Sequence, residues 1–477
     1  MNILSLDGFI VAAFLLITLV VGLRAGRGVK DIREYALGSK HINLGVLTMS
    51  FLATYIGGHN ITALPASVFA YGIIQAITIG TFVSLLLGAI LLPPILVRYK
   101  DCMTLGEVFH SSYKARSAQV ISGLIGLIFS VLMVGGQIWG LGYVGSTVFG
   151  LDPETVLWTV GLSLVLYTAA GGVRSVAFTD VLQFMALTLV VSLMANKLCQ
   201  EVGGVKMLFF KVHQAYPKHL QFFNHPYFYK KMASSLLWGF FPVVLLYPPI
   251  LQRLLMVDTP AQARNMLINS SLFYMVFRVM IMIIGLGALL LHPEIKPGNF
   301  TPFLIKEVFS QGMQGILVCG VLAVMMSTAD SFLNTAGIIA VRDIIRPLSA
   351  TFSTKHSFFV CEVRLMQLLT LVIGVLAIMT AQKSAHTHQM LFYSRVTLSS
   401  LIIPFFGSIF STKNNVTLLV GSLMGFVVGT VAAIYSSDSP LYFYSSKNKD
   451  AIALCGLLGS GIAFISLKLA SYRGRTL

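Results

Sequence analysis

Residues 53–65 read ATYIGGHNITALP and interrupt a long apolar run in the N-terminal part of the chain. Paired glycines weaken a helix, and a histidine, an asparagine and a proline follow them in the same run. Irregular backbone at membrane depth is tolerated only where protein or a water-filled cavity satisfies its polar groups. If this run crosses a bilayer, the stretch therefore indicates a broken helix beside a site.

The composition is typical of a membrane protein. Of the 477 residues, 56% are hydrophobic and 10% are charged, whereas soluble proteins carry about 25% charged residues. In a soluble protein the net charge of +16 would suggest nucleic acid as a partner. In a membrane protein it reflects basic cytoplasmic loops, so we expect a lipid bilayer and no nucleic acid. Five scattered cysteines without a CxxC pair argue against a metal cluster or a disulfide scaffold.

The apolar runs predict an all-α integral membrane protein. A bilayer core of about 30 Å needs roughly 20 apolar residues per helix, and such runs predict about thirteen transmembrane helices. The first is not a cleavable signal peptide, because it opens with Asp7 and lacks a small-residue cleavage site. The predicted spans lie near 5–23, 45–70, 73–97, 118–149, 155–172, 178–199, 232–256, 269–291, 312–341, 361–382, 389–411, 416–435 and 450–468.

The basic residues predict the orientation. With the N-terminus outside, most of the 33 Lys and Arg residues, Arg253 among them, fall in connections on the cytoplasmic side, where such residues collect. This predicts a multi-pass protein of the plasma (inner) membrane with a cytoplasmic C-terminus. The longest extramembrane stretch, 200–231, carries His213, His219 and His225. A metal site there is the alternative to a solvated, aromatic-rich loop, which we favour because structural metal sites usually add Cys or carboxylate ligands.

A second interruption lies in the seventh predicted span, where residues 238–249 read WGFFPVVLLYPP. The second and seventh spans are five helices apart and cross the membrane in opposite directions. Interrupted helices in corresponding positions of two halves are typical of secondary transporters built from inverted repeats, with the binding site at the breaks. The alternative is a pair of ordinary Gly/Pro kinks.

Two carboxylates fall within predicted spans. Asp330 lies inside the ninth span and Asp180 at the start of the sixth, and an unpaired charge at this depth is costly enough to mark a functional candidate. Ser327, Ser331 and Asn334 share a helix face with Asp330. Such a stripe of oxygen atoms suits a hard cation such as Na⁺ or a proton site, and a hydrogen-bonded helix-packing face is the alternative.

Three segments resemble the sodium/solute symporter family, which includes the sodium:proline symporter group. They are residues 167–183 (YTAAGGVRSVAFTDVLQ), 326–331 (MSTADS) and 252–264 (QRLLMVDTPAQAR). The resemblance implies a LeuT-type 5+5 inverted repeat with one extra N-terminal and two extra C-terminal helices. The expected divisions are 1–44 for the extra N-terminal helix and its loop, 45–200 for the first repeat, 201–231 for an extracytoplasmic loop, 232–411 for the second repeat and 412–477 for the two C-terminal helices.

The resemblance also implies two ion sites. The main sodium site would be formed by the backbone carbonyls of Ala53, Ile56 and Val324 and by the hydroxyls of Ser327 and Thr328. A second cation or proton site would be formed by Asp180, Asp330 and Ser331. Because Asp180 follows Thr179 near the expected start of a helix, a helix-capping role is the alternative. Tyr55 stands where the proline carrier has a carboxylate important for sodium, and Gly57 where serine is common, which leaves the substrate and the coupling open.

The substrate site should lie beside the two breaks. Its candidates are Tyr55, Gly57, Gly58, Asn60, Gln75, Gln137, Trp238, Phe241 and Tyr247. For Gln137 a helix–helix hydrogen bond is the alternative, and for Arg278 we expect snorkelling or an internal pair. Since no Lys or Arg is placed plainly in the cavity, a small zwitterion or a neutral polyol fits better than a strongly anionic solute.

These observations predict a sodium-coupled symporter that imports a small polar organic solute, such as an amino acid, by alternating access. Na⁺ is the expected coupling ion, and no organic cofactor is expected. We expect no enzyme, because no paired acid and base, nucleophile motif or phosphate-binding loop appears. A proton-coupled carrier of the same fold, in which Asp330 or Asp180 titrates, and a ligand sensor that does not transport are the alternatives. The oligomeric state stays open.

Overall fold

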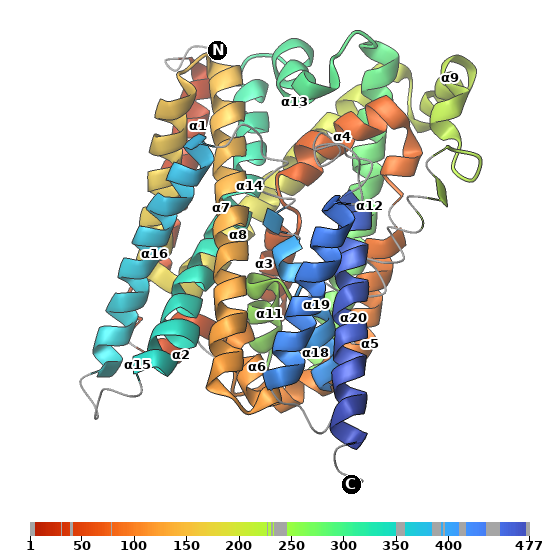
Figure 1. Ribbon diagram of the computed structural model, residues 1–477. Coiled ribbons are helices and arrows are strands. Elements are labelled where there is room, and N and C mark those ends of the chain that lie inside the picture. The colour runs from red at the N-terminus through yellow and green to blue at the C-terminus, as the bar shows by residue number, and fades with distance from the viewer. Residues whose placement is uncertain are drawn as a thin grey trace.

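The computed structural model describes residues 5–29, 31–38, 42–77, 79–226, 228–229, 232, 246–349, 358–383, 393–394, 396–409, 416–435 and 449–473. Within these ranges every regular element is a helix, so the all-α prediction is confirmed (Figure 1). Seven helical segments of the described chain are long and apolar enough to cross a membrane. The count of about thirteen spans remains a prediction.

In chain order, we call the helices up to Val202 the N-terminal run and those from Val205 onward the C-terminal run. The N-terminal run consists of α1 (Leu6–Ala25), α2 (Ile32–Leu37), α3 (Leu44–Tyr55), α4 (His59–Tyr71), η1 (Ile73–Gln75), α5 (Ile79–Leu96), η2 (Val97–Tyr99), α6 (Leu105–Tyr113), α7 (Arg116–Phe149) and α8 (Pro153–Val202). The C-terminal run consists of α9 (Val205–Ala215), η3 (Pro217–Leu220), α11 (Pro248–Leu255), α12 (Pro260–Leu291), η5 (Pro297–Asn299), α13 (Phe300–Phe303), η6 (Leu304–Val308), α14 (Met313–Ile339), η7 (Ala340–Ile345), α15 (Arg346–Ser349), α16 (Phe358–Lys383), α18 (Ile402–Ile409), α19 (Val416–Tyr435) and α20 (Lys449–Arg473).

The predicted break in the second span is present. Helix α3 ends at Tyr55 and α4 begins at His59, and Ile56 leaves the helical conformation with φ −84° and ψ 78°. Figure 1 shows α4 above and to the right of α3 rather than in line with it. The last carbonyls of α3 and the first amides of α4 therefore meet in the interior, where the site must satisfy them.

Helix α8 is 50 residues long but contains a sharp kink. Gly172 has φ 61° and ψ −158°, so two helical segments meet there, as the separate predicted spans 155–172 and 178–199 require. A Cβ at Gly172 would lie 2.7 Å from the carbonyl oxygen of Tyr35. Glycine is needed because both this approach and the positive φ exclude a side chain.

Helix α14 lies at the centre of the bundle. It packs against α1, α3, α7, α8 and α16, and nearly all of its residues are buried. By contrast, 28% of α1 is buried inside the protein. Polar side chains on α14 therefore face other helices rather than lipid. Its neighbours include α3, which ends at the break, and the kinked helix α8.

Part of the stretch 200–231, which the sequence analysis expects outside the membrane, packs against the C-terminal end of α4. Nε2 of His219, in η3, lies 3.1 Å from the carbonyl oxygen of Phe69, and partial burial lowers the pKa of His219. Among the residues the structure describes, no group of three or more His, Cys, Asp or Glu side chains is arranged to hold a metal ion.

Candidate functional site

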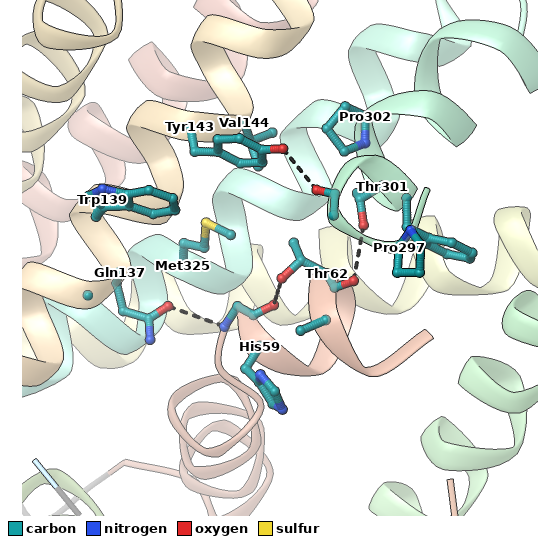
Figure 2. A pocket seen from close by; sticks show the side chains of 16 residues that line it. His59, Thr62, Gln137, Trp139, Tyr143, Val144, Pro297, Thr301, Pro302 and Met325 are labelled. Atoms are coloured by element: carbon teal, nitrogen blue, oxygen red, sulfur yellow. Dashed lines mark hydrogen bonds between the residues drawn. The ribbon is translucent and has the colours of Figure 1, made fainter. Parts of the chain in front are cut away.

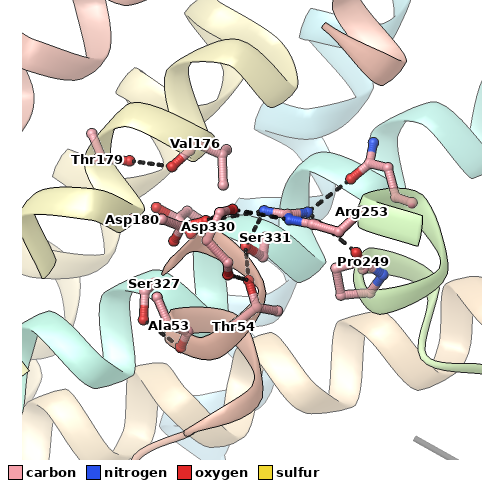
Figure 3. A network of polar contacts seen from close by, with 12 residues as sticks. Ala53, Thr54, Val176, Thr179, Asp180, Pro249, Arg253, Ser327, Asp330 and Ser331 are labelled. Carbon is pink, nitrogen blue, oxygen red and sulfur yellow. Dashed lines mark hydrogen bonds and ion pairs between the residues drawn. The ribbon is translucent and has the colours of Figure 1, made fainter. Parts of the chain in front are cut away.

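The end of α3 and the middle of α14 bring several oxygen atoms together, among them those of Ala53 and Ser327 (Figure 3). Oγ of Ser327 lies 2.9 Å from the carbonyl oxygen of Ala53 and 3.0 Å from that of Val324. Oγ1 of Thr328 lies 3.1 Å from the same Val324 oxygen and 3.4 Å from the carbonyl oxygen of Thr54. Four of the five residues that the resemblance assigns to the main sodium site are thus brought together by the fold.

The local structure explains why these oxygens converge. Carbonyls in the last turn of a helix have no intrahelical partner, and α3 stops two residues after Ala53. Ile56, the fifth candidate ligand, is the buried residue at the break itself. A site built only from carbonyl and hydroxyl oxygens matches the preference of hard cations such as Na⁺ for oxygen ligands.

Two of the three residues of the second candidate site, Asp180 and Ser331, contact the same arginine. Asp180, Asp330 and Ser331 are fully buried. The guanidinium of Arg253 lies 3.1 Å from Oδ2 of Asp180 and donates a 2.8 Å hydrogen bond to Oγ of Ser331 (Figure 3). The expectation that Arg253 lies in a cytoplasmic connection is wrong. Helix α11 spans Pro248–Leu255, so Arg253 lies within it. The charged side chain of Arg253 is fully buried among the helices.

Both carboxylates have specific partners. Oδ2 of Asp180 accepts a 2.5 Å hydrogen bond from Ser50 as well as the contact from Arg253. Because Asp180 lies inside α8 and binds side chains of other helices, the helix-capping alternative does not hold. Oδ2 of Asp330 accepts a 2.8 Å hydrogen bond from the hydroxyl of Tyr167. Tyr167 and Asp180 both belong to α8, and the kink at Gly172 lies between them.

A hydroxyl contact joins the two groups of candidate ion ligands. Oγ of Ser331, which contacts Arg253, lies 2.8 Å from Oγ1 of Thr54, and the carbonyl of Thr54 is the one near Thr328. All four residues are buried. A continuous series of buried contacts therefore runs from Arg253 through Ser331 and Thr54 to Thr328.

A cavity of about 360 Å³ lies beside the break. Gly58 and Gln137 line it, and the backbone N–H of Gly58 donates a 3.2 Å hydrogen bond to Oε1 of Gln137 (Figure 2). A Cβ at Gly58 would lie 2.7 Å from Cγ of Met325, so glycine permits this close approach. Gln137 thus makes the helix–helix hydrogen bond given as its alternative and also faces the cavity.

Three other substrate candidates, Gly57, Asn60 and Tyr55, are not among the residues that line the cavity. A Cβ at Gly57 would lie 3.4 Å from Oγ1 of Thr328. Asn60 and Tyr55 turn toward Tyr274 of α12: Oδ1 of Asn60 accepts a 3.2 Å hydrogen bond from the Tyr274 hydroxyl, and the rings of Tyr55 and Tyr274 are 5.2 Å apart.

Two further candidates, Tyr247 and Gln75, have other surroundings. Tyr247 packs against the rings of Phe129 and Phe332. The carbonyl of Gln75 is held by Arg278, whose guanidinium donates 2.8 Å hydrogen bonds to it and to the carbonyl of Ala76. Arg278 therefore binds backbone carbonyls at the end of η1. Trp238 and Phe241 lie outside the described residues.

The cavity has lining residues that the sequence analysis missed. The main ones are His59, Thr62, Trp139, Tyr143, Thr301 and Met325. The rings of Trp139 and Tyr143 stack 5.5 Å apart. Helical spacing from Gln137 through Gly140 to Tyr143 could have identified the wall formed by α7. No Asp, Glu, Lys or Arg appears among the described residues that line the cavity.

Comparison with known protein families identifies this architecture. A profile described as the sodium:solute symporter family matches residues 35–429. The sodium/proline symporter of Escherichia coli (strain K12) is 24% identical over 383 residues, covering 76% of this chain and 74% of that protein. The sodium/pantothenate symporter of Haemophilus influenzae is 24% identical over 388 residues, covering 78% and 79%.

Solved structures with the same fold include two transporters. A Na⁺-coupled sialic acid symporter, in a substrate-bound outward-open state, superimposes with a TM-score of 0.77 at 18% identity, covering 97% of this chain and 98% of the other. A nucleobase-cation-symport-1 family transporter in a closed conformation gives a TM-score of 0.57 at 12% identity, covering 94% and 96%. At these identities the likeness concerns the fold.

Proposed function

Because the chain belongs to the sodium:solute symporter family, a family of transporters and not of enzymes, we propose that it imports a small polar organic solute, such as an amino acid, together with Na⁺ by alternating access. We further propose that it lies in the plasma (inner) membrane with its N-terminus outside and its C-terminus in the cytoplasm. Its helices would then form two inverted five-helix repeats with one additional helix before and two after them.

The observation that carries the proposal is the group of converging oxygen atoms between α3 and α14. The carbonyl of Ala53 and the hydroxyls of Ser327 and Thr328 belong to helices far apart in the chain, and one of these helices is broken at this point. A bound Na⁺ would hold the end of α3 against α14. Release of the ion would remove this restraint, so ion binding favours one arrangement of the broken helix over another.

The proposed solute site is the cavity next to this group of oxygen atoms. Its polar groups include the amide of Gln137 and the hydroxyls of Thr62 and Thr301, and its walls include the ring of Trp139. Neutral hydrogen-bonding groups on an apolar wall suit an uncharged or zwitterionic solute better than a strongly anionic one. The relatives named above carry proline, pantothenate and sialic acid, which are small polar organic solutes.

Coupling follows from the shared elements. Gly57 is close to both proposed sites, because a Cβ there would lie 3.4 Å from Oγ1 of Thr328 and 3.6 Å from Nε2 of Gln137. If Na⁺ and solute each favour the same arrangement of the break, each raises the affinity for the other. The membrane potential supplies about 2.3 kcal/mol per charge per 100 mV, which would drive accumulation of the solute.

The first test is a thermal-stability screen of the purified protein against amino acids, vitamins, sugars and carboxylates, with and without Na⁺. A solute that stabilises the protein only in Na⁺ identifies substrate and coupling together, because binding to the folded state raises its apparent stability.

Uptake of that solute into proteoliposomes, measured with Na⁺ and then with K⁺ at fixed pH, is the second test. Uptake that requires Na⁺ supports the proposal. Uptake that persists in K⁺ indicates a proton-coupled carrier instead. Binding without uptake under any gradient indicates a ligand sensor.

A further inference from the structure

Two histidines that follow α9 contact the C-terminal end of the broken helix. Nε2 of His219, in η3, lies 3.1 Å from the carbonyl oxygen of Phe69 in α4. Because a carbonyl only accepts, this nitrogen carries the hydrogen. His225 hydrogen-bonds to the backbone of Tyr71, the last residue of α4. The last carbonyls of a helix have no intrahelical partner, so the two histidines supply partners where α4 ends.

The backbones of α4 and η3 also approach each other closely here. Gly72 directly follows α4 with φ 80°, and a Cβ at this position would lie 2.5 Å from Cα of His219. The rings of Tyr216 and His219 lie edge to face, with centroids 5.6 Å apart. Tyr216 and Leu220 pack against a buried cluster of apolar side chains from α4, α8, α9 and α12, which includes Val68, Val202, Leu208, Val212 and Leu286. The contact is therefore a packed interface as well as a pair of hydrogen bonds.

This interface offers no negative partner to a protonated histidine. Helices α4, η1, α9 and η3 and residues 221–226 contain no Asp or Glu. Glu201, near the end of α8, pairs with Lys197. The titratable and charged side chains of the interface elements are His59, Tyr71, Lys206, Lys211, His213, Tyr216, Lys218, His219 and His225.

Protonation therefore opposes the contact. Burial lowers the pKa of both His219 and His225, and the charge of His225 lowers the pKa of His219 further. The packed arrangement thus binds protons less readily than the separated one. By linkage, the contact is favoured above about pH 6.5, the usual pKa of histidine, and weakens as the pH falls through the lowered values.

We propose that neutral His219 and His225 are positioning residues that hold the C-terminal end of α4 against η3, and that acidification releases this end and weakens solute binding. Helix α4 begins at the break, and its first turns supply His59, Thr62 and Ala63 to the wall of the cavity. An ordered wall binds a solute at a smaller entropic cost than a mobile one. The effect on solute binding rests on the proposed function, whereas the release of α4 does not.

The release of α4 is tested by hydrogen–deuterium exchange of the full-length purified protein. Exchange of residues 69–77 is compared at about pH 7.5 and about pH 5, where an ordinary histidine changes its charge, after correction for the intrinsic effect of pH. We expect faster exchange at the lower pH in the native chain. The double variant His219→Gln with His225→Gln keeps side-chain N–H donors but takes up no proton, so we expect equal exchange at both pH values.

The effect on solute binding is tested by uptake into proteoliposomes with a fixed Na⁺ gradient and the same pH on both sides. We expect KM for the solute found in the stability screen to rise severalfold in the native chain as the pH falls, and to stay constant in the double variant. The candidate sodium ligands belong to α3 and α14, so we expect the sodium affinity to stay the same in both.

His213→Gln is the matched control, because His213 lies in α9 of the same segment and is exposed. We expect this variant to keep the native pH dependence in both measurements. Thermal unfolding reports whether each variant is folded, and His219→Gln alone replaces the double variant in the comparison if the double variant does not fold.

Native exchange that does not change with pH overturns the proposal. Exchange that rises equally in the native chain and the double variant also overturns it, and so does a loss of pH dependence in His213→Gln. The expected exchange together with a constant native KM overturns the effect on solute binding. The expected exchange without any Na⁺-dependent uptake supports the contact between the histidines and α4 and overturns the proposed function.

Discussion

The backbone N–H of Gly58 donates a 3.2 Å hydrogen bond to Oε1 of Gln137, and this contact ties the break between α3 and α4 to the middle of α7. An amide freed by a broken helix at membrane depth needs an acceptor from the protein or from a water-filled cavity, because lipid tails supply none. Gln137 provides that acceptor and also lines the cavity proposed for the solute. The break is therefore stabilised by a side chain that faces this cavity.

The first prediction concerns this hydrogen bond. Gln137→Leu leaves the amide of Gly58 without its acceptor and removes a polar group from the cavity. Loss of such a bond costs about 1–3 kcal/mol, so we expect KM for the solute found in the stability screen to rise by roughly tenfold or more. Gln119→Leu is the matched control, since Gln119 lies on the same helix but binds Arg342 and Asp343. An unchanged KM in Gln137→Leu would exclude Gln137 from solute binding.

The second prediction concerns the candidate sodium site. Thr328→Ala removes a hydroxyl that lies within 3.4 Å of carbonyls from both α3 and α14, and we expect sodium affinity to fall by roughly tenfold, equal to about 1.4 kcal/mol. Sodium-dependent thermal stabilisation measures this affinity. Thr335→Ala is the control, because Thr335 lies on the same helix and bonds only to its own helix carbonyls in the contacts described. Equal sodium affinity in the two variants would show that Thr328 is not a ligand.

The third prediction concerns the close approach at the break. A Cβ at Gly58 would lie 2.7 Å from Cγ of Met325 and 3.0 Å from Oε1 of Gln137. Because such overpacking costs about 1–3 kcal/mol, we expect Gly58→Ala to lower the thermal midpoint and to reduce transport. Gly298→Ala tests the same cavity wall with no atom within 4 Å of the added Cβ. We expect Gly298→Ala to have the same thermal midpoint as the native chain. A similar fall of the midpoint in both variants would refute the steric explanation.

The fourth prediction concerns the reactivity of Cys102, which lies in the connection after η2. Burial, together with the nearby carboxylates of Glu107 and Asp101, raises the pKa of this thiol to about 12. The thiolate is the reactive form, so the thiol stays protonated and slow to react at neutral pH. We expect labelling of a variant that retains only Cys102 to accelerate about tenfold per pH unit between pH 7 and 10.

The same variant unfolded in detergent provides the control. Its thiol returns to an ordinary pKa of about 8.5, so its labelling rate should be far higher at pH 7 and should level off above pH 9. If native and unfolded chains react at the same rate, Cys102 is not shielded in the way the structure describes.

Local patterns predicted several features correctly. The glycine pair at positions 57 and 58 predicted the break between α3 and α4, because glycine destabilises the interior of a helix. The spacing of Ser327, Asp330 and Ser331 predicted one polar face, and the structure buries that face at the centre of the bundle. The family resemblance then supplied the partner carbonyl of Ala53, which the structure places 2.9 Å from Ser327.

Other features could not be read from local patterns. The sequence-based placement of Arg253 in a loop was wrong, because a basic residue near the end of an apolar run looks the same whether it faces cytoplasm or protein. The ion pair with Asp180 spans 73 positions in the chain and the contact with Ser331 spans 78. Tyr55, Asn60 and Tyr247 were likewise expected at the solute site, yet their side chains pack against residues of other helices.

The sequence by itself determined that this is a helical membrane protein with a broken helix, an oxygen-rich helix face and the motifs of a symporter, since composition, periodicity and helix-breaking residues act over a few neighbouring positions. The tertiary structure alone decided that the charge of Asp180 is met by Arg253 and that Thr301 and Met325 join Gln137 around one cavity. Such contacts depend on how separate helices pack, and in a low-dielectric interior that packing decides which polar group finds a partner.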